Sequence, residues 1–213
     1  MKNIVSRLFV VVTLACSCIV SAGAQEKESA STQGSSAKGS STKDSKGDMK
    51  QKIELKKEKL GTTKNVSRFG NVYLAGQFSQ NDIKLLKDKG IKTVITLRRD
   101  KEVDWNEKQK LADAGIKLIK VPFSGPDSLD DKVFDQVRKA FKDAAKQDKD
   151  APLMLHCGSA NRVGAVWAAH RALDQKVELE DAIEEAKKVG LRTAEYIPKV
   201  KDYVKRQQMA GKK

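Results

Sequence analysis

Apolar and polar residues alternate in blocks over residues 71–155, and these blocks predict strands and helices in turn. Short runs rich in β-branched residues are typical of buried strands, whereas apolar residues spaced three and four apart are typical of amphipathic helices. Strands are predicted at residues 71–76, 91–97, 116–121 and 152–155. This rhythm predicts an α/β fold with a mainly parallel central sheet flanked by helices.

Helices are predicted between and after these strands. The predicted helices follow the N-cap Ser79, span residues 105–114, begin at Asp130 and Asp131, and cover residues 163–173, 179–189 and 194–209. Glycines stop the first two, and acids at the start of the third suit its helix dipole. Trp105 and Trp167 lie at helical spacing among apolar neighbours, so we expect both in the core.

The first 24 residues have the pattern of an export signal. A short positive region precedes an apolar run over residues 8–20, and small residues at 22–24 form a cleavage site. The apolar run is short for a bilayer span. We expect cleavage after Ala24 and an exported protein that is periplasmic or secreted. The alternative, a lipoprotein anchored on Cys16, fits its acceptor pattern less well because Leu14 sits one place late.

Residues 25–60 are built mainly from Ser, Lys, Gly, Gln and Glu, a composition that predicts a flexible tether. One domain is then expected over residues 61–210. The net charge is +14, with lysines interleaved with acids. We expect these charges to form a solvated surface on a monomeric protein. The alternative is that the lysines attract anionic envelope components weakly. No nucleic-acid binding is predicted, because no aromatic platform accompanies the lysines.

The segment Leu155-His156-Cys157-Gly158-Ser159-Ala160-Asn161-Arg162-Val163-Gly164 carries the candidate chemistry. With Cys16 and Cys18 removed in the signal, Cys157 is the one cysteine expected in the mature chain. A strand–loop–helix turn directs backbone N–H groups and the helix dipole at one point, and Arg162 adds a bidentate cation. The predicted oxyanion cradle consists of Gly158, Ser159, Ala160, Asn161, Arg162 and Val163. The same positive field favours a thiolate nucleophile at Cys157.

Other interpretations of these residues remain open. A free cysteine is often a small buried hydrophobe, although the small-residue loop and Arg162 favour a nucleophile here. His156 is expected to be structural, bonding nearby backbone and helping to hold the thiolate. His170 is expected to be a packing or surface residue.

Four short motifs together resemble a known family. They are Tyr73-Leu74-Ala75-Gly76-Gln77, Thr93-Val94-Ile95-Thr96-Leu97-Arg98, Glu102, and the stretch from His156 to Arg162. From residue 71 to about 191 the chain resembles the phosphatase-like domain of beta-lactamase-hydrolase-like proteins. That domain belongs to the cysteine-phosphatase superfamily and is similar to dual-specificity phosphatases. The resemblance implies hydrolysis of phosphomonoesters through a cysteinyl-phosphate, with Cys157 as nucleophile and Arg162 on the equatorial oxygens.

The resemblance also implies an aspartate that protonates the leaving group. Asp127, thirty residues before Cys157, occupies the expected loop, and Asp130 is its competitor. A turn or cap beside Pro126 is an equally good interpretation of Asp127. Arg98 is expected to pair with Glu102 at the surface rather than to reach the pocket rim.

Two departures from the family pattern keep alternatives open. Four residues separate Cys157 from Arg162, where typical cysteine phosphatases have five, and Val163 replaces the usual Ser or Thr. A shorter loop is similar to that of rhodanese-type sulfurtransferases, which would carry a persulfide on Cys157. A silent oxyanion-binding module is the second alternative. No cofactor is expected, because the sequence has no metal-ligand cluster or nucleotide-binding motif.

Overall fold

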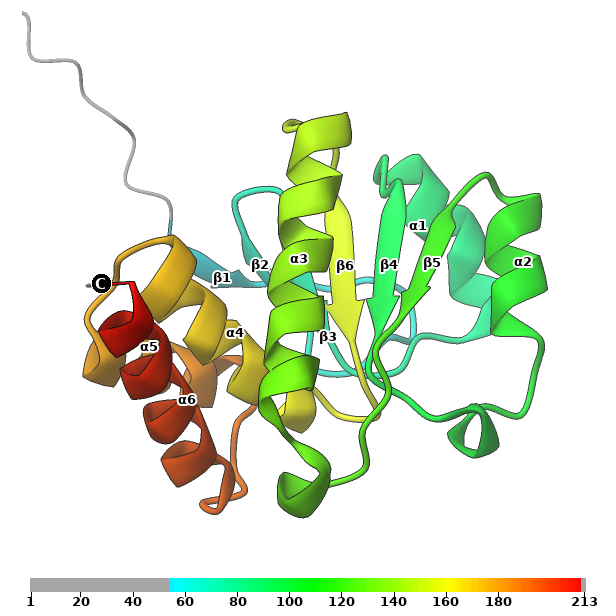
Figure 1. Cartoon of the computed structure of the whole chain (residues 1–213). Coiled ribbons are helices and arrows are strands. Elements are labelled where there is room, and N and C mark those ends of the chain that lie inside the picture. The colour runs from blue at the N-terminus through cyan, green and yellow to red at the C-terminus, as the bar shows by residue number, and fades with distance from the viewer. Residues whose placement is uncertain (1–53, 212–213) are drawn as a thin grey trace, which may run out of the picture. The chain divides into compact units, whose positions relative to one another are not determined.

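A computed structural model describes residues 54–211. The predicted export signal and most of the predicted tether lie outside the described residues. The described part contains a six-stranded sheet in the order β1-β2-β3-β6-β4-β5 (Figure 1). Its strands are β1 (Leu55–Lys57), β2 (Ser67–Phe69), β3 (Val72–Ala75), β4 (Thr93–Thr96), β5 (Lys117–Lys120) and β6 (Leu153–His156).

Strands β3, β6, β4 and β5 run parallel, while β1 and β2 add an antiparallel edge. The predicted fold class, a mainly parallel sheet flanked by helices, is therefore confirmed. The sequence pattern does not predict these two strands, because each has only three residues and neither contains an apolar run: β1 has two exposed lysines, and β2 has the sequence Ser-Arg-Phe. The predicted domain start at residue 61 is too late, since β1 pairs with β2 and Leu60 is fully buried.

The helices fall close to their predicted positions. They are α1 (Ile83–Asp88), α2 (Glu107–Asp113), α3 (Asp131–Gln147), α4 (Asn161–Asp174), α5 (Leu179–Val189) and α6 (Tyr196–Ala210). Three 3-10 turns, η1 (Gln80–Asp82), η2 (Asp100–Glu102) and η3 (Pro126–Ser128), lie in the connections. Within the described range, no helix combines the length and apolarity needed to cross a membrane.

The two tryptophans differ in their environment. Trp167 on α4 is fully buried, as predicted. Trp105 is half-buried and precedes α2, because Asn106 caps that helix by accepting the Gln109 N–H at 3.1 Å. The Trp105 ring meets Phe78 edge-on at 5.8 Å, so it still packs against the core from the connecting loop.

Helices cover both faces of the sheet (Figure 1). Alternate residues of β3 point to opposite sides: Val72 and Leu74 join the core beneath α3, α4, α5 and α6, whereas Tyr73 and Ala75 join the core with α1 and α2. Side chains alternate in this way along any strand. The carboxyl ends of β3, β6, β4 and β5 line up at one edge, which brings the loops that follow them together.

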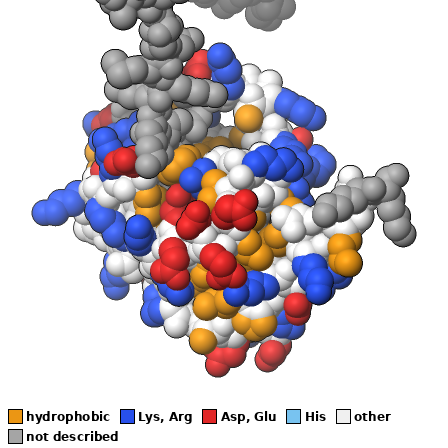
Figure 2. Space-filling model, turned by 90° about the vertical axis from the view of Figure 1, so that its left-hand side faces the viewer, with side chains coloured by type: hydrophobic (Ala, Val, Ile, Leu, Met, Phe, Trp, Pro, Cys, Tyr) orange, Lys and Arg blue, Asp and Glu red, His pale blue; other side chains and the backbone are white. Residues whose placement is uncertain are grey.

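The surface carries both signs of charge. Figure 2 shows Asp and Glu side chains gathered in the middle of one face, with Lys and Arg side chains around them and apolar side chains between. Because acidic and basic side chains are mixed, this face is expected to be well solvated and not to produce a strong electrostatic potential of one sign.

Candidate active site

Cys157 lies in the loop between β6 and α4, at the edge where the parallel strands end. The Cys157 N–H donates to the Ala75 carbonyl at 3.2 Å, and the Gln77 N–H donates to the Gly158 carbonyl at 3.2 Å. The loop is therefore fixed to the end of β3. The thiol is free and only 1% exposed, so an attacking sulfur would lie at the bottom of the site, beneath the loop.

Ala160 makes the sharp turn that connects this loop to α4. Its φ of 66° and ψ of 0° place it in the left-handed region, which costs energy for a residue with a Cβ. Among the described residues, the backbone N–H groups of Gly158, Ser159, Asn161 and Arg162 donate no hydrogen bond. Free N–H groups at a helix start are the donors that an oxyanion requires.

Arg162, in the first turn of α4, is held from three sides. Its Nη1 donates to the carbonyls of Leu97 and Phe123 at 2.9 and 2.5 Å, and to Glu102 Oε2 at 3.0 Å. Its Nη2 donates to Glu102 Oε1 at 3.1 Å. The guanidinium is thus fixed at the carboxyl ends of β4 and β5, with 9% of the residue exposed.

Glu102 is the partner that orients this guanidinium. Burial would raise the pKa of Glu102, but hydrogen bonds from Arg162 and Arg99 and the charge of Arg162 lower it to about 2. Glu102 is therefore ionised at neutral pH. The predicted surface pair between Arg98 and Glu102 is wrong, because η2 turns Glu102 toward the site, where it accepts the Arg99 N–H at 2.7 Å.

His156 is fully buried behind the loop, against the Phe78 ring at 4.8 Å. Burial lowers its pKa to about 3, and the charges of Arg98 and Arg162 act in the same direction. The imidazole is therefore neutral. Its Nε2 lies 3.4 Å from Glu107 Oε1, and burial raises the pKa of Glu107. These positions suit a structural role for His156.

The second histidine, His170, lies on α4 away from the loop. Its ring stacks on Phe141 at 4.4 Å, and its Nδ1 lies 2.9 Å from Asp174 Oδ2. Only 7% of the residue is exposed, so its predicted role in packing is confirmed.

A buried aromatic pair that the sequence did not reveal packs beside Arg162. Tyr196, the first residue of α6, is 2% exposed and meets the Phe123 ring edge-on at 6.2 Å. Burial raises the pKa of Tyr196; the Arg162 charge opposes this, while Cys157 and Glu102 add to it. Phe123, whose carbonyl accepts a hydrogen bond from Arg162, therefore connects Tyr196 to the site. The only signal in the sequence was an aromatic residue early in a predicted helix.

Asn161 and Val163 face away from the predicted cradle. The Asn161 Oδ1 accepts the N–H groups of Arg192 and Thr193 at 2.8 and 3.2 Å, and its Nδ2 donates to Thr193 Oγ1 at 2.7 Å. The Val163 side chain is fully buried in the core. These two side chains fix the fold around the loop, so any contact they make with an anion comes from the backbone.

Ser159 lies at the outer rim of the loop. Its Oγ accepts from Arg192 Nη2 at 2.7 Å, and its carbonyl accepts from Asn65 Nδ2 at 3.0 Å. Arg192 and Thr193 come from the connection between α5 and α6. No local pattern points to them, because their link to the loop crosses more than thirty residues of chain.

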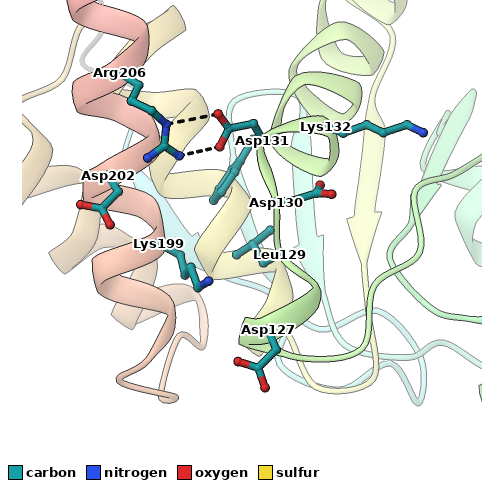
Figure 3. Close-up of a pocket in the computed structure, with 9 residues that line it drawn as sticks. Asp127, Leu129, Asp130, Asp131, Lys132, Lys199, Asp202 and Arg206 are labelled. Atoms are coloured by element: carbon teal, nitrogen blue, oxygen red, sulfur yellow. Dashed lines mark hydrogen bonds and ion pairs between the residues drawn. The ribbon is translucent and has the colours of Figure 1, made fainter.

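Asp127 lies in η3 and is exposed. It borders a pocket of about 450 Å³ that contains none of the loop residues (Figure 3). The pocket is lined by Asp127, Leu129, Asp130, Asp131, Lys132, Phe134, Lys199, Asp202 and Arg206. In Figure 3 the Asp127 carboxylate points away from the other labelled residues. No hydrogen bond within residues 54–211 joins Asp127 to Cys157 or Arg162.

Asp130, the competing acid, has a clear structural task. It is the N-cap of α3, and its Oδ1 accepts the Val133 N–H at 2.9 Å. A carboxylate engaged in this way stabilises the helix start. As for metals, the described part of the chain brings no three His, Cys, Asp or Glu side chains together in a group that could hold an ion.

Comparison with known proteins agrees with this geometry. Residues 51–202 match the family described as "DSP-PTPase phosphatase fused to NAD+ Kinase". A search of curated proteins found no significant match. The fold is similar to that of P. aeruginosa TpbA, with 20% identity, a TM-score of 0.55, and coverage of 73% of this chain and 91% of that one.

Two further solved structures share the fold. PTPMT1, solved in complex with PI(5)P, is 19% identical with a TM-score of 0.54, and the match covers 66% of this chain and 94% of that one. Tk-PTP in its active form is 14% identical with a TM-score of 0.58, covering 63% and 92%. The family match spans most of the chain, including β1, the Cys157 loop and Arg162. The chain therefore belongs to the DSP-PTPase family of cysteine-dependent phosphatases.

Proposed function

We propose that the protein hydrolyses phosphomonoesters through a phosphate ester of the Cys157 thiol. The observation that carries the proposal is the loop itself: free N–H groups at Gly158 and Ser159, a strained turn at Ala160, and Arg162 fixed beside it. Donors held in advance where negative charge develops stabilise a phosphoryl-transfer transition state without reorganisation.

The reaction has two steps. In the first, the Cys157 thiolate attacks phosphorus, the bond from phosphorus to the leaving oxygen breaks, and that oxygen takes a proton from an acid. In the second, water attacks the cysteinyl-phosphate and gives up a proton to the same group, which releases phosphate and restores the thiolate. Every proton is accounted for, so no cofactor is needed.

Arg162 and the loop amides have complementary tasks in this scheme. The Arg162 charge is shared with Glu102, so their sum is close to zero. The free N–H groups and the positive end of α4 then provide the net attraction for a doubly charged phosphate. Glu102 fixes the direction of the guanidinium, and the fixed direction favours bidentate contact with two phosphate oxygens.

Asp127 is the acid in this proposal. Its loop starts at Phe123, whose carbonyl binds Arg162, so the segment is connected to the site at one end. Asp127 is exposed and no hydrogen bond holds it within the described residues, whereas Asp130 caps α3. An exposed acid can reach a leaving group that lies above the loop. The Cys157 thiol lies below it.

Val163 sets an expectation for the second step. The usual hydroxyl after the arginine helps the thiolate to leave, and Val163 offers none and is buried. We expect the cysteinyl-phosphate to break down slowly. A rapid burst of leaving group followed by a slower steady rate is the kinetic sign of such an intermediate.

The test is release of p-nitrophenol from its phosphate by the wild-type protein. Cys157→Ser should abolish turnover, and Asp127→Asn should lower kcat about 10²-fold or more while leaving phosphate binding unchanged. Asp130→Asn is the matched control, since it removes the neighbouring carboxylate. Absence of hydrolysis, together with sulfur transfer from thiosulfate to cyanide, would assign a sulfurtransferase. Phosphate binding with neither activity would assign a silent binding module.

The substrate class follows from chemistry rather than from a single relative. TpbA with one Cys-to-Ser substitution was solved in complex with pTyr, and PTPMT1 was solved in complex with PI(5)P. The feature that pTyr and PI(5)P share is a phosphomonoester. A phosphomonoester is therefore the proposed substrate, and the enzyme is proposed to act as a monomer without nucleic-acid partners.

Export is a separate proposal that rests on residues 1–24. A cleaved signal would deliver the enzyme to the periplasm or outside the cell, with a lysine-rich segment preceding the domain. Weak contact with anionic envelope components would then be available to that segment. The measurement is N-terminal sequencing of the mature protein from fractionated cells. A cytoplasmic protein that keeps its first residues would contradict the proposal.

A further inference from the structure

We infer that Glu107, the first residue of α2, is a positioning residue for the Cys157 loop: its carboxyl group donates a hydrogen bond to His156 Nε2 and so fixes which ring nitrogen of His156 is protonated. The inference rests on the proposed function, because it takes Cys157 as the nucleophile, and it adds a residue from the other face of the sheet. It starts from a group of buried polar atoms without a hydrogen-bond partner within residues 54–211. They are Gln77 Oε1, Arg98 Nε, Arg99 Nε, Glu107 Oε1, and His156 Nδ1 and Nε2.

His156 and Cys157 are neighbours in the chain, but their side chains lie on opposite faces of the sheet. The Cys157 side chain belongs to the core beneath α3, α4, α5 and α6. The His156 ring packs on Phe78, which belongs to the core with α1 and α2. Side chains alternate in this way along extended chain. The ring therefore acts on Cys157 from the side of the backbone and not from the side of the sulfur.

Glu107 is the carboxyl group that faces this ring. Its Oε1 lies 3.4 Å from His156 Nε2, and 7% of the Glu107 side chain and 0% of the His156 side chain are exposed. Neither atom forms a hydrogen bond with any other group in the described part of the chain. Two acceptor atoms at this distance in a buried site repel each other, whereas a proton between them makes a hydrogen bond that satisfies both. The geometry therefore calls for one proton between Glu107 and His156.

Glu107 is the better holder of that proton. Burial raises the pKa of Glu107, and this effect exceeds those of a hydrogen bond from Gln77 and of the Arg98 charge, which both lower it. Burial lowers the pKa of His156 to about 3. At about pH 5 the carboxyl group is therefore mostly protonated while the ring is neutral, so the carboxyl O–H donates to Nε2.

This hydrogen bond decides where the single N–H of the neutral ring lies. When Nε2 accepts, the proton of His156 is on Nδ1. Burial lowers the pKa of the ring, and so do the charges of Arg98 and Arg162. The backbone of Cys157 raises it, which is the effect of an acceptor beside a ring N–H. An N–H at Nδ1 attracts that backbone, whereas an unprotonated Nδ1 repels it, so the tautomer that Glu107 selects favours one position of the loop.

The direct test identifies the tautomer of His156 by nitrogen NMR of the histidine rings. The chain has two histidines, so His170→Gln assigns the signals. At about pH 5, wild-type His156 should carry its proton on Nδ1. Glu107→Leu should convert the ring wholly or partly to the Nε2–H tautomer. Glu107→Gln should keep Nδ1–H, because the amide N–H is a donor at the same place.

The second measurement follows the Cys157 thiolate by its ultraviolet absorbance, with the Cys157→Ser protein as the blank. Glu107→Leu should lower the ratio of thiolate to thiol about fivefold at about pH 5, the factor that corresponds to one ordinary hydrogen bond. Glu107→Gln should stay close to wild type. The matched control is Glu58→Leu, which removes a half-buried carboxylate that pairs with Lys89 at 3.1 Å and should change neither the tautomer nor the thiolate ratio.

The outcomes separate this inference from the proposed function. Wild-type His156 protonated on Nε2 at about pH 5 refutes the inference, and this measurement needs no variant that could fail to fold. A folded Glu107→Leu protein with an unchanged tautomer or an unchanged thiolate ratio refutes it as well. Neither measurement depends on turnover. Hydrolysis of p-nitrophenyl phosphate by the wild type tests the proposed function separately, so an inactive protein that gives the expected tautomers contradicts the function and supports the role of Glu107.

Discussion

The ion pair between Glu102 and Arg162 provides the sharpest test of how the cradle is held. Glu102→Gln keeps the size of the side chain but removes the charge that faces the guanidinium. In this variant Arg162 would still donate hydrogen bonds to the carbonyls of Leu97 and Phe123, at 2.9 and 2.5 Å, but its positive charge would no longer face a carboxylate. A largely buried charge without a partner destabilises the folded state, so we expect a lower free energy of unfolding.

The magnitude follows from the pKa of Glu102. Burial would raise that pKa, but Arg162 and Arg99 lower it from 4.5 to about 2. This difference corresponds to about 3 kcal/mol favouring the folded state when Glu102 is ionised. The Glu102 side chain is 24% exposed, so solvent screening reduces the effect, and we expect a loss of about 1–3 kcal/mol at pH 7.

The sign of the pH dependence follows from the same values. A carboxyl group with a lowered folded-state pKa stabilises fully above its unfolded value, and the contribution disappears as pH falls through the folded value. The difference between wild type and Glu102→Gln should therefore be largest above about pH 5.5. It should shrink as pH falls from 4.5 toward 2.

The assay is urea denaturation of both proteins at pH 7 and at pH 3. Glu180→Gln is the control, because Glu180 pairs with Lys201 at 2.6 Å but its side chain is 73% exposed. That variant should lose less than about 1 kcal/mol. An equal loss in the two variants, or a Glu102→Gln loss that does not change between pH 7 and pH 3, would refute the reasoning.

Three other predictions test the surroundings of the site. Asp174→Asn removes the charged partner of Arg138, whose Nη2 lies 2.8 Å from Asp174 Oδ1, and only 11% of the Asp174 side chain is exposed. We expect the free energy of unfolding to fall by about 3 kcal/mol, which calorimetry would detect as a lower Tm. Gly190→Ala introduces a Cβ at a φ of +147° and should cost about 1–2 kcal/mol and lower phosphatase turnover; unchanged stability would show that the chain between α5 and α6 adapts freely. Burial raises the pKa of Glu107, so its charged form is unfavourable in the folded state, and the unfavourable contribution is absent at low pH where the group is neutral in both states. Glu107→Gln should therefore gain stability over wild type at pH 8 and differ little below pH 4, as followed by urea denaturation.

The strands and helices were predictable because their signals are local. The apolar blocks that form β4 and β6 and the spacing that forms α3 depend on neighbouring residues only. The position of Cys157 between a strand and a helix was predictable for the same reason. The sequence pattern did not predict β1 and β2, because β1 is held by pairing with β2, and β2 by pairing with β3, rather than by their own composition.

The sequence by itself determined the α/β layering and the strand–Cys157–helix loop, since both are encoded within a few residues of chain. Only the tertiary structure decided which side chains surround that loop. Glu102 reaches Arg162 across 60 residues, and Arg192 reaches Ser159 across 33. These partners meet because the connections between the strands and helices bring distant segments together at one edge of the sheet. A local sequence pattern does not contain that information. The nucleophile is therefore visible in the sequence, whereas the charges that orient its substrate are not.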